Sequence, residues 1–258
     1  MNSARYARRA RGFTLTELAV VFTIISLLLA TALFTLSAQT EQRNFEETRR
    51  RLDAARELLL AFAIVNGRLP CPATAASAGT EAITTAPNCD SPYGGFLPAR
   101  AIGFQVVDTN GFALDAWQNR IRYAVSSATP FGCAVTPLSS DLPHFTIAAN
   151  LRKNGITCQP NDLVVCNQSP ATVTNTTCDA NTSVTNLRVV VAIVFSTGKN
   201  GATGGTGTNE ARNLDSNALF VSRTPDPTGA AGGEFDDQMQ WISVGELYGK
   251  LIAAGILP

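Results

Sequence analysis

The stretch that decides the fold is "RRARGFTLTELAVVFTIISLLLATALF", from Arg8 to Phe34, an apolar run behind a basic start with one acid, Glu17, near its beginning. Over residues 18–38 only Thr and Ser interrupt the apolar residues. A helix of that length, at about 1.5 Å per residue, crosses roughly 30 Å of hydrocarbon. The sequence therefore predicts a transmembrane helix over about residues 18–38. A lone carboxylate is costly in hydrocarbon, so Glu17 indicates a partner or a function.

The charges around this run are asymmetric. Four arginines precede it without any acid, and the next arginine is Arg43. This distribution places the N-terminus in the cytoplasm and the rest of the chain on the other side of the membrane. Without those four arginines, 16 basic residues stand against 20 acidic ones, a formal charge of −4. Such a surface offers no general attraction to phosphates, so nucleic acid is not an expected partner.

Three interpretations of the N-terminal run compete. A secretory signal cut near "LSAQ" fits the basic start, but the run is longer than the usual 7–15 residues or so and contains an acid. A plain transmembrane anchor explains the length and leaves Glu17 unexplained. The third rests on the order of an arginine-rich leader, Gly12, Phe13-Thr-Leu-Thr-Glu17 and an unbroken apolar helix. This order resembles the N-terminus of type IV pilins and type II secretion pseudopilins.

The resemblance implies a processing route and a place in the cell. A prepilin peptidase would cut after Gly12, remove the leader 1–12, and methylate the new amine at Phe13. That cationic amine would meet the carboxylate of Glu17 in a neighbouring subunit, which lowers the desolvation cost of both charges. The protein would cross the bacterial inner membrane once, with a periplasmic head, and join other pilin or pseudopilin subunits through an inner-membrane assembly platform.

Residues 13–66 are predicted to form one long helix. After the apolar run, side chains at alternating steps of three and four form a helical seam. The seam comprises Phe45, Thr48, Leu52, Ala55, Leu59 and Phe62, widened near its end by Leu58, Ala61 and Val65. The charged residues fall largely away from it and are expected to be solvated. Gly67, followed by Pro70, is a stop signal.

Residues 67–258 are expected to form a globular head, which gives an α+β fold: the long helix packed on an antiparallel sheet, with a short C-terminal helix. The strand-like runs are "AIGFQVV" (101–107), "NRIRYAVS" (119–126), "HFTIAA" (144–149), "LRVVVAIVFS" (187–196), "NALFVS" (217–222) and "QMQWISV" (238–244). Ser243 with Glu246 three residues later matches a capping box that would begin the last helix.

Six cysteines lie beyond the apolar run, and none forms a C-x-x-C pair: Cys71, Cys89, Cys133, Cys158, Cys166 and Cys178. An even count in a loop-rich sequence favours disulfides made in an oxidising compartment over a zinc site, with buried free thiols as the alternative. The six allow 15 pairings, among which only nearness suggests Cys71 with Cys89. The stretch 134–185 holds three of them and is expected to be a disulfide-rich insertion.

Two segments of the head extend the resemblance. "DAWQNRIRY", Asp115 to Tyr123, is similar to the Asp-x-Trp-Gly-Asn segment and following Tyr of major pseudopilins, with Gln118 in place of the usual Gly. Packing is the expected role of Trp117 and Tyr123, rather than contact with a partner.

The second segment joins "FSTGKNG" (195–201) to "GGEFDDQMQW" (232–241) and resembles the calcium loop of those pseudopilins. The resemblance implies Asp237 and Asn200 as ligands, and Asp236 would restore the charge that Asn200 lacks. Calcium takes six to eight oxygens from such side chains. An insertion of about thirty residues separates the two halves, and surface turns rich in Asp and Gly are the alternative.

Nothing in the sequence indicates an enzyme. His144 is the only histidine, and G-x-S-x-G, H-E-x-x-H and P-loop patterns do not occur. The sequence therefore predicts a structural filament subunit. The resemblance implies a minor one, because the head is larger than in typical major subunits of the family, and the retained Glu17 argues against the tip subunit, which commonly lacks this acid. The alternative is a membrane-anchored periplasmic binding or adhesive module whose disulfide-rich insertion recognises a ligand.

Overall fold

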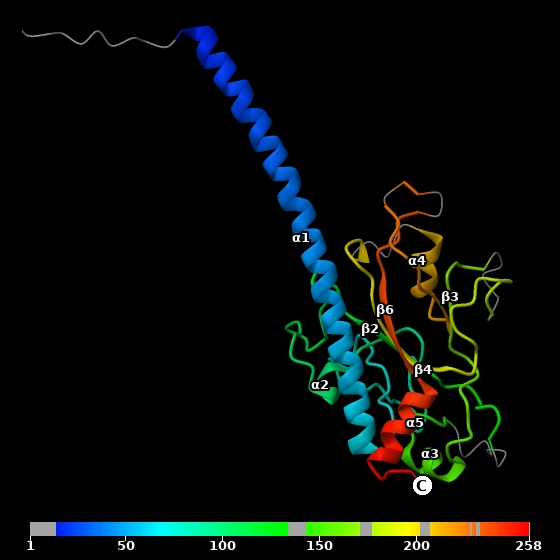
Figure 1. Ribbon diagram of the computed structural model, residues 1–258. Helices are drawn as coiled ribbons and strands as arrows, with labels where there is room; N and C mark the ends of the chain where they lie inside the picture. Colours follow the sequence, from blue (N-terminus) through cyan, green and yellow to red (C-terminus); the bar gives the residue numbers. More distant parts are fainter. Residues whose placement is uncertain are drawn as a thin grey trace, which may run out of the picture. The chain divides into compact units, whose positions relative to one another are not determined.

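The computed structural model describes residues 14–133, 143–170, 177–201, 207–227, 229–230 and 233–257, with the side chains of residues 31–37 excepted. The chain divides into two compact units, Met1–Asn44 and Phe45–Pro258. Helix α1, Leu15–Asn66, contributes to both (Figure 1). The expected cleavage site, Gly12 and Phe13, lies outside the described residues.

The first unit consists of the N-terminal part of α1. Its large apolar side chains are exposed, with Leu18 at 50% and Leu27 at 69%. Among the described residues, no helix is both long enough and apolar enough to cross a membrane, in contrast to the span expected over about residues 18–38.

The second unit contains the predicted antiparallel sheet. Its four strands lie in the order β1 (Gly95–Phe96), β2 (Arg122–Val125), β4 (Val190–Ser196) and β6 (Gln238–Ser243). All three pairings are antiparallel, with Tyr123 opposite Val194 and Ile193 opposite Trp241. A separate parallel pair, β3 (Val164–Cys166) and β5 (Leu219–Val221), was not expected. The α+β class with an antiparallel sheet is thus confirmed.

Four short helices complete this unit: α2 (Ala99–Ile102), α3 (Ala148–Asn154), α4 (Thr208–Asn213) and α5 (Val244–Ala253). The predicted start of α5 is confirmed, because the Glu246 amide donates to Ser243 Oγ at 3.2 Å. Two predicted strands are wrong. The run 101–107 begins inside α2, and 144–149 leads into α3. Short apolar runs do not distinguish strand from helix by periodicity, and Gly103 ends α2 with a φ of +76°.

Strand β4 is buried along its whole length and on both faces. On one face Val191 and Val194 join the cluster that contains the second half of α1. On the other face Ile193 and Phe195 pack with Phe220 of β5. Because both faces of the strand are buried, its sequence is a continuous apolar run and does not alternate between apolar and polar residues.

The second half of α1 packs on the sheet through the predicted seam. Its buried members are Thr48, Leu52, Ala55 and Leu59. The expectation that Val65 and Ala61 widen the seam is wrong, since Val65 is 81% exposed and Ala61 is exposed too. Leu60 and Ala63 are buried instead, so the stripe rotates toward the opposite flank of the helix.

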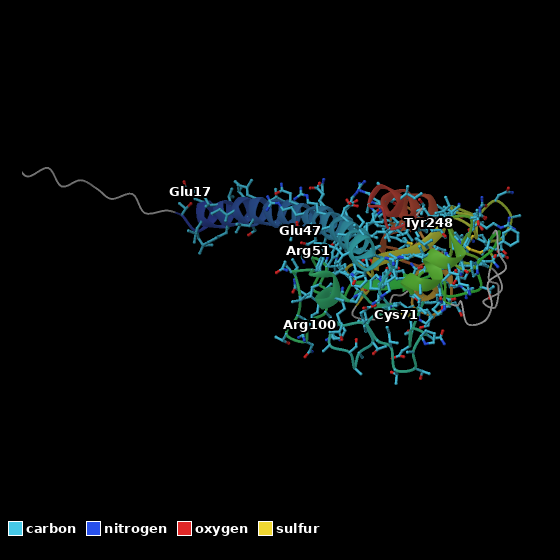
Figure 2. The ribbon with its side chains drawn as sticks, turned by 90° about the horizontal axis from the view of Figure 1, so that it is seen from below. Glu17, Glu47, Arg51, Cys71, Arg100 and Tyr248 are labelled. Carbon is cyan, nitrogen blue, oxygen red and sulfur yellow. A yellow bond between two sulfur atoms is a disulfide. The ribbon has the colours of Figure 1, made fainter. Side chains whose placement is uncertain are left out.

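Two of the arginines expected to be solvated anchor α1 to the head. Arg51 Nη1 donates to the carbonyl oxygen of Asp115 at 2.7 Å, and Arg51 Nε donates to Glu47 at 2.9 Å (Figure 2). Arg56 forms an ion pair with Glu246 in the first turn of α5. The guanidinium groups of both arginines thus reach backbone and carboxylate oxygens beside the seam.

The cysteines form three disulfides, Cys71–Cys89, Cys133–Cys158 and Cys166–Cys178. The pairing suggested by nearness in the sequence is therefore confirmed, and the alternative of free thiols is wrong. The bond from Cys133 to Cys158 closes the start of the disulfide-rich insertion, and the bond from Cys166 ties the end of β3. Cross-links of this kind limit the conformational freedom of the unfolded chain. Each typically stabilises the folded state by about 2–4 kcal/mol.

His144 is buried in a hydrogen-bond chain that links α3 to α5. Asn154 Nδ2 lies 3.2 Å from Nδ1 of the imidazole, and Tyr248 Oη lies 3.0 Å from Nε2. The Tyr248 hydroxyl in turn donates to the Cys158 carbonyl at 2.6 Å. These partners suit a neutral ring that accepts at Nδ1 and donates at Nε2. Burial lowers the pKa of His144 from 6.5 to about 4.

We predict that this histidine makes the protein less stable in acid. The unfolded chain binds a proton at His144 as the pH falls through about 6.5, whereas the folded chain resists until about pH 4. The free energy of unfolding should therefore drop across that window, by up to about 3 kcal/mol. Urea unfolding at pH 7, 5.5 and 4 measures it. The matched control is His144→Gln, which keeps a donor and an acceptor without titrating; a parallel pH profile in that variant would contradict the prediction.

Candidate functional site

The described N-terminus begins with a reciprocal cap on helix α1. The backbone N–H and the hydroxyl of Thr14 both donate to Glu17 Oε2 at 2.9 Å. The backbone N–H of Glu17 donates back to Thr14 Oγ1 at 3.3 Å. A Thr followed three residues later by Glu is the sequence pattern of a capping box, which was predicted at Ser243 and not at Thr14.

This cap accounts for part of Glu17. An anionic side chain in the first turn favours the helix, because it satisfies orphan N–H groups and faces the positive end of the helix dipole. Among the described residues, every hydrogen bond given to this side chain ends on Oε2. The cap is one role for Glu17, and it engages Oε2 and not the second carboxylate oxygen.

Three acids of the head form a compact buried group, Glu210, Asp236 and Asp237. One carboxylate oxygen from each lies within 4.8 Å of the others, and their exposed fractions are 1%, 5% and 7%. Glu210 comes from α4, and the two aspartates come from the segment just before β6. The structure therefore brings together the predicted Asp236 and Asp237 and adds Glu210. No spacing signal pointed to Glu210, because it lies in the insertion between the two predicted halves.

Asn200, the third predicted ligand, also lies in this group. Its Nδ2 donates to both oxygens of Glu210, at 3.1 and 3.0 Å. Its backbone N–H donates to Asp236 Oδ2 at 3.3 Å, and the Lys199 N–H donates to the same oxygen at 2.8 Å. The turn after β4 thus holds Asp236 from one side, while Asn213 holds Asp237 through a 2.7 Å hydrogen bond.

The pKa values of both aspartates are raised, mainly by burial. Burial, with the charges of Glu210 and Glu234, raises the pKa of Asp236 to about 6. Burial, with the charges of Glu210 and Asp236, raises the pKa of Asp237 to about 8. Buried like charges this close are unfavourable unless protons or a cation neutralise them.

The donor set fits a hard divalent cation. It consists of carboxylate oxygens from three residues, without sulfur or imidazole, which suits calcium or magnesium. In addition, Asp236 Oδ1 is buried and has no hydrogen-bond partner among the residues that the structure describes. A buried acceptor in that state costs free energy, and a bound cation is one way to satisfy it.

Hydrogen bonds from the "DAWQN" segment hold the turn that carries Asn200. The Asp115 carboxylate accepts hydrogen bonds from the backbone N–H of Asn119 at 2.8 Å and from Ser196 Oγ at 2.6 Å. The Asn119 amide donates to the Gly198 carbonyl at 2.6 Å. Gln118 has a φ of +69°, a conformation that glycine adopts freely, which explains the glycine at this position in the resembling segment.

Packing is the role of the two aromatic residues of this segment. Tyr123 is fully buried, and its hydroxyl donates to the Pro70 carbonyl at 3.2 Å. Trp117 packs edge-on against Phe45 of α1, with ring centroids 4.9 Å apart. The segment therefore acts within the fold of the head.

Comparison with known families identifies the N-terminus. The family described as "Prokaryotic N-terminal methylation motif" matches residues 7–33. The chain thus carries the signature of the prepilin-type signals of type IV pilins and pseudopilins, and the match includes Gly12, Phe13 and Glu17. No curated protein and no solved structure matches the chain.

We predict that Gly198→Ala destabilises the head more than a simple change of backbone preference would. Gly198 has a φ of +61°, and an added Cβ would overlap Asp236 Oδ1. The matched control is Gly103→Ala, with a φ of +76° and no atom within 4 Å of the new Cβ. We expect a loss of about 1 kcal/mol at Gly103 and about 2–4 kcal/mol at Gly198, measured by urea unfolding. Equal losses would contradict the close approach of Gly198 to Asp236.

Proposed function

We propose that this chain is a structural subunit of a helical filament of the type II secretion pseudopilus or type IV pilus kind. The observation that carries the proposal is the methylation motif over residues 7–33, which leads directly into helix α1. Cleavage on the N-terminal side of the apolar helix removes the leader and leaves the helix in the mature subunit. The helix is then available for assembly.

We infer that the apolar helix exchanges one apolar environment for another. The exposed side chains of Leu18, Phe22 and Leu27 require a cover that water does not supply. In the bacterial inner membrane lipid tails would provide it, with the head in the periplasm. In the filament, the helices of other subunits would provide it. The transfer costs little hydrophobic free energy, because lipid tails and apolar helix faces are similar solvents for these side chains.

Glu17 gives the assembly its register in this proposal. Prepilin peptidase would expose and methylate the amine of Phe13, and that cation would bind Glu17 of a neighbouring subunit. The Thr14 donors occupy Oε2, so Oε1 can accept from the amine without loss of the helix cap. Pairing lowers the desolvation cost of both charges, which favours the axial offset at which they meet.

We further propose that calcium binds Asp236, Asp237 and Glu210, with Asn200 beside them, and stabilises the head. The short distances among the buried acids and the unsatisfied Asp236 Oδ1 support this. No catalytic role is proposed. The other partners would be the prepilin peptidase and the inner-membrane assembly platform.

Processing at Gly12 is the first expected outcome. Mass spectrometry of the protein purified from membranes of a cell with a prepilin peptidase should find an N-methylated chain that starts at Phe13. Cleavage should fail in Gly12→Val, because this change replaces the glycine of the motif at the proposed cut with a branched side chain. A mature chain that starts near residue 40 would instead indicate an ordinary secretory signal and contradict the proposal.

Substitution at Glu17 should stop assembly and leave the head folded. We expect Glu17→Ala to reduce filament yield at least tenfold, scored by shearing and immunoblotting, with an unchanged thermal unfolding midpoint. Thr14→Val separates the two roles of Glu17, because it removes both capping hydrogen bonds of the Thr14 hydroxyl and keeps the carboxylate. It should still assemble, as should Asp53→Ala, a change at an exposed acid of the same helix. Equal failure of Thr14→Val and Glu17→Ala would indicate that capping alone is the role of Glu17.

Calcium should stabilise the full chain against heat. At a free concentration 100 times the dissociation constant, the gain is about 2.7 kcal/mol, or several degrees for a protein of this size. Glu210→Gln and Asp236→Asn should lose this response, and the exposed control Asp53→Asn should keep it. No shift in the unsubstituted chain, or a shift that survives both acid substitutions, would remove the cation site.

A further inference from the structure

The parallel strands β3 and β5 lead into loops that line one pocket. Because the two strands run in the same direction, their carboxyl ends lie at one edge. The pairing continues one step further, where the Ser222 N–H donates to the Cys166 carbonyl at 2.8 Å. Beyond it the two following loops separate, and ligands of parallel sheets often bind at such an edge.

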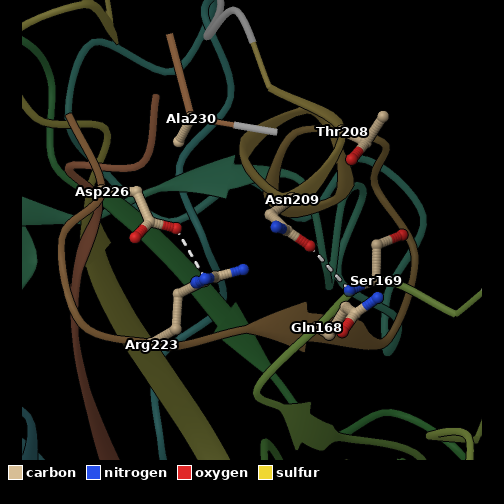
Figure 3. A pocket seen from close by; sticks show the side chains of 7 residues that line it. All are labelled: Gln168, Ser169, Thr208, Asn209, Arg223, Asp226 and Ala230. Atoms are coloured by element: carbon tan, nitrogen blue, oxygen red, sulfur yellow. Dashed lines mark hydrogen bonds and ion pairs between the residues drawn. The ribbon is translucent and has the colours of Figure 1, made fainter. Parts of the chain in front are cut away.

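A polar cavity of about 590 Å³ occupies this place. Residues from both loops and from α4 line it: Gln168, Ser169, Thr208, Asn209, Arg223 and Asp226 (Figure 3). Its volume is within the range of roughly 300–1,000 Å³ of small-molecule sites, but its lining is far more polar than usual. None of the three clustered acids lines it.

The lining is held in place by bonds of its own. Asn209 is 4% exposed, and its Oδ1 accepts the Ser169 N–H at 2.7 Å, which turns its amide nitrogen toward the side of Arg223 and Asp226 (Figure 3). Arg223 and Asp226 form an ion pair of 2.6 Å. Two backbone hydrogen bonds, of 2.9 and 3.1 Å, join Asp226 to Phe235. A prearranged site loses less entropy when it binds a ligand.

The chemistry of the lining selects a neutral ligand with many hydroxyl groups. The amides of Gln168 and Asn209 present donors, Gln168 adds an acceptor, and the hydroxyls of Ser169 and Thr208 do both. Among the described lining residues, the only charges are those of Arg223 and Asp226, which cancel each other. A strongly ionic ligand would therefore gain no net electrostatic attraction. An apolar ligand would displace water from the polar lining groups without replacing the hydrogen bonds that the water made.

We propose that this cavity, the β3–β5 pocket, binds a neutral saccharide. Each sugar hydroxyl both donates and accepts a hydrogen bond, which matches the fixed amide of Asn209, the amide of Gln168 and the hydroxyls of Ser169 and Thr208. The pocket is built from the disulfide-rich insertion and from the insertion that carries α4. Saccharide binding is independent of the filament role, so either can fail without the other.

Saturation-transfer NMR on the full chain tests the pocket. The ligands are glucose, galactose, mannose, N-acetylglucosamine and their common disaccharides, and the dissociation constant of the strongest is measured by calorimetry. We expect at least one neutral saccharide to bind, and Gln168→Ala and Thr208→Ala each to weaken it roughly three- to tenfold, as expected for one lost hydrogen bond. Both residues are exposed at the rim, so the fold should tolerate the changes.

The matched control is Gln105→Ala, at an exposed glutamine that does not line the pocket, which should bind like the unsubstituted chain. Three results would overturn the proposal: no saturation transfer from any neutral saccharide at millimolar concentration, binding that Gln168→Ala and Thr208→Ala leave unchanged, or a preference for sugar phosphates or uronic acids over neutral sugars.

Discussion

The head depends on the burial of one strand, β4, between two apolar layers. Val191 and Val194 face the cluster that includes α1, while Ile193 and Phe195 face the cluster that includes β5. A strand enclosed on both sides contributes the full transfer free energy of each side chain, about 1.5–3 kcal/mol for a large one. It also fixes register, because a slip by one residue would exchange the two faces. The antiparallel neighbours β2 and β6 and the helix α1 are arranged around this constraint.

A buried carboxylate connects this core to the acid cluster. Asp115 accepts hydrogen bonds from Trp117, Asn119 and Ser196, and burial raises its pKa against their effect. Its backbone carbonyl accepts from Arg51 of α1. From the helix to the turn after β4 the contacts are therefore continuous, and that turn holds Asp236. Such a network is stable only if every member is satisfied, which places strict requirements on the segment around Asp115.

The N-terminal acid has a simpler local setting. Within one chain, Glu17 closes a capping box with Thr14. The cap explains why the helix starts at this position. It also gives the acid a role that needs no second subunit. The methylation motif covers the same residues. In the proposed function, the amine of a neighbouring subunit would give this carboxylate a second partner. One carboxylate with two oxygens can serve both purposes.

The sequence alone determined the features that arise from local order and periodicity. These are the motif with Gly12, Phe13 and Glu17, the long helix, the buried seam from Thr48 to Leu59, and the cap of α5 at Ser243. Nearness also gave Cys71–Cys89, because a short loop closes readily. Strands with long apolar runs were found, whereas 101–107 and 144–149 were mistaken for strands, since four to seven residues carry too little periodicity to separate the two states.

Only the tertiary structure decided which distant residues meet. Glu210 joins Asp236 and Asp237 because α4 folds back over the turn after β4, and no spacing in the chain encodes that return. The parallel pair β3–β5, the polar cavity at its edge and the partners of Arg51 and Arg56 likewise arise from contacts across long sequence separations. Periodicity fixes which face of an element is apolar; the packing of those faces against one another fixes which polar groups are then buried together.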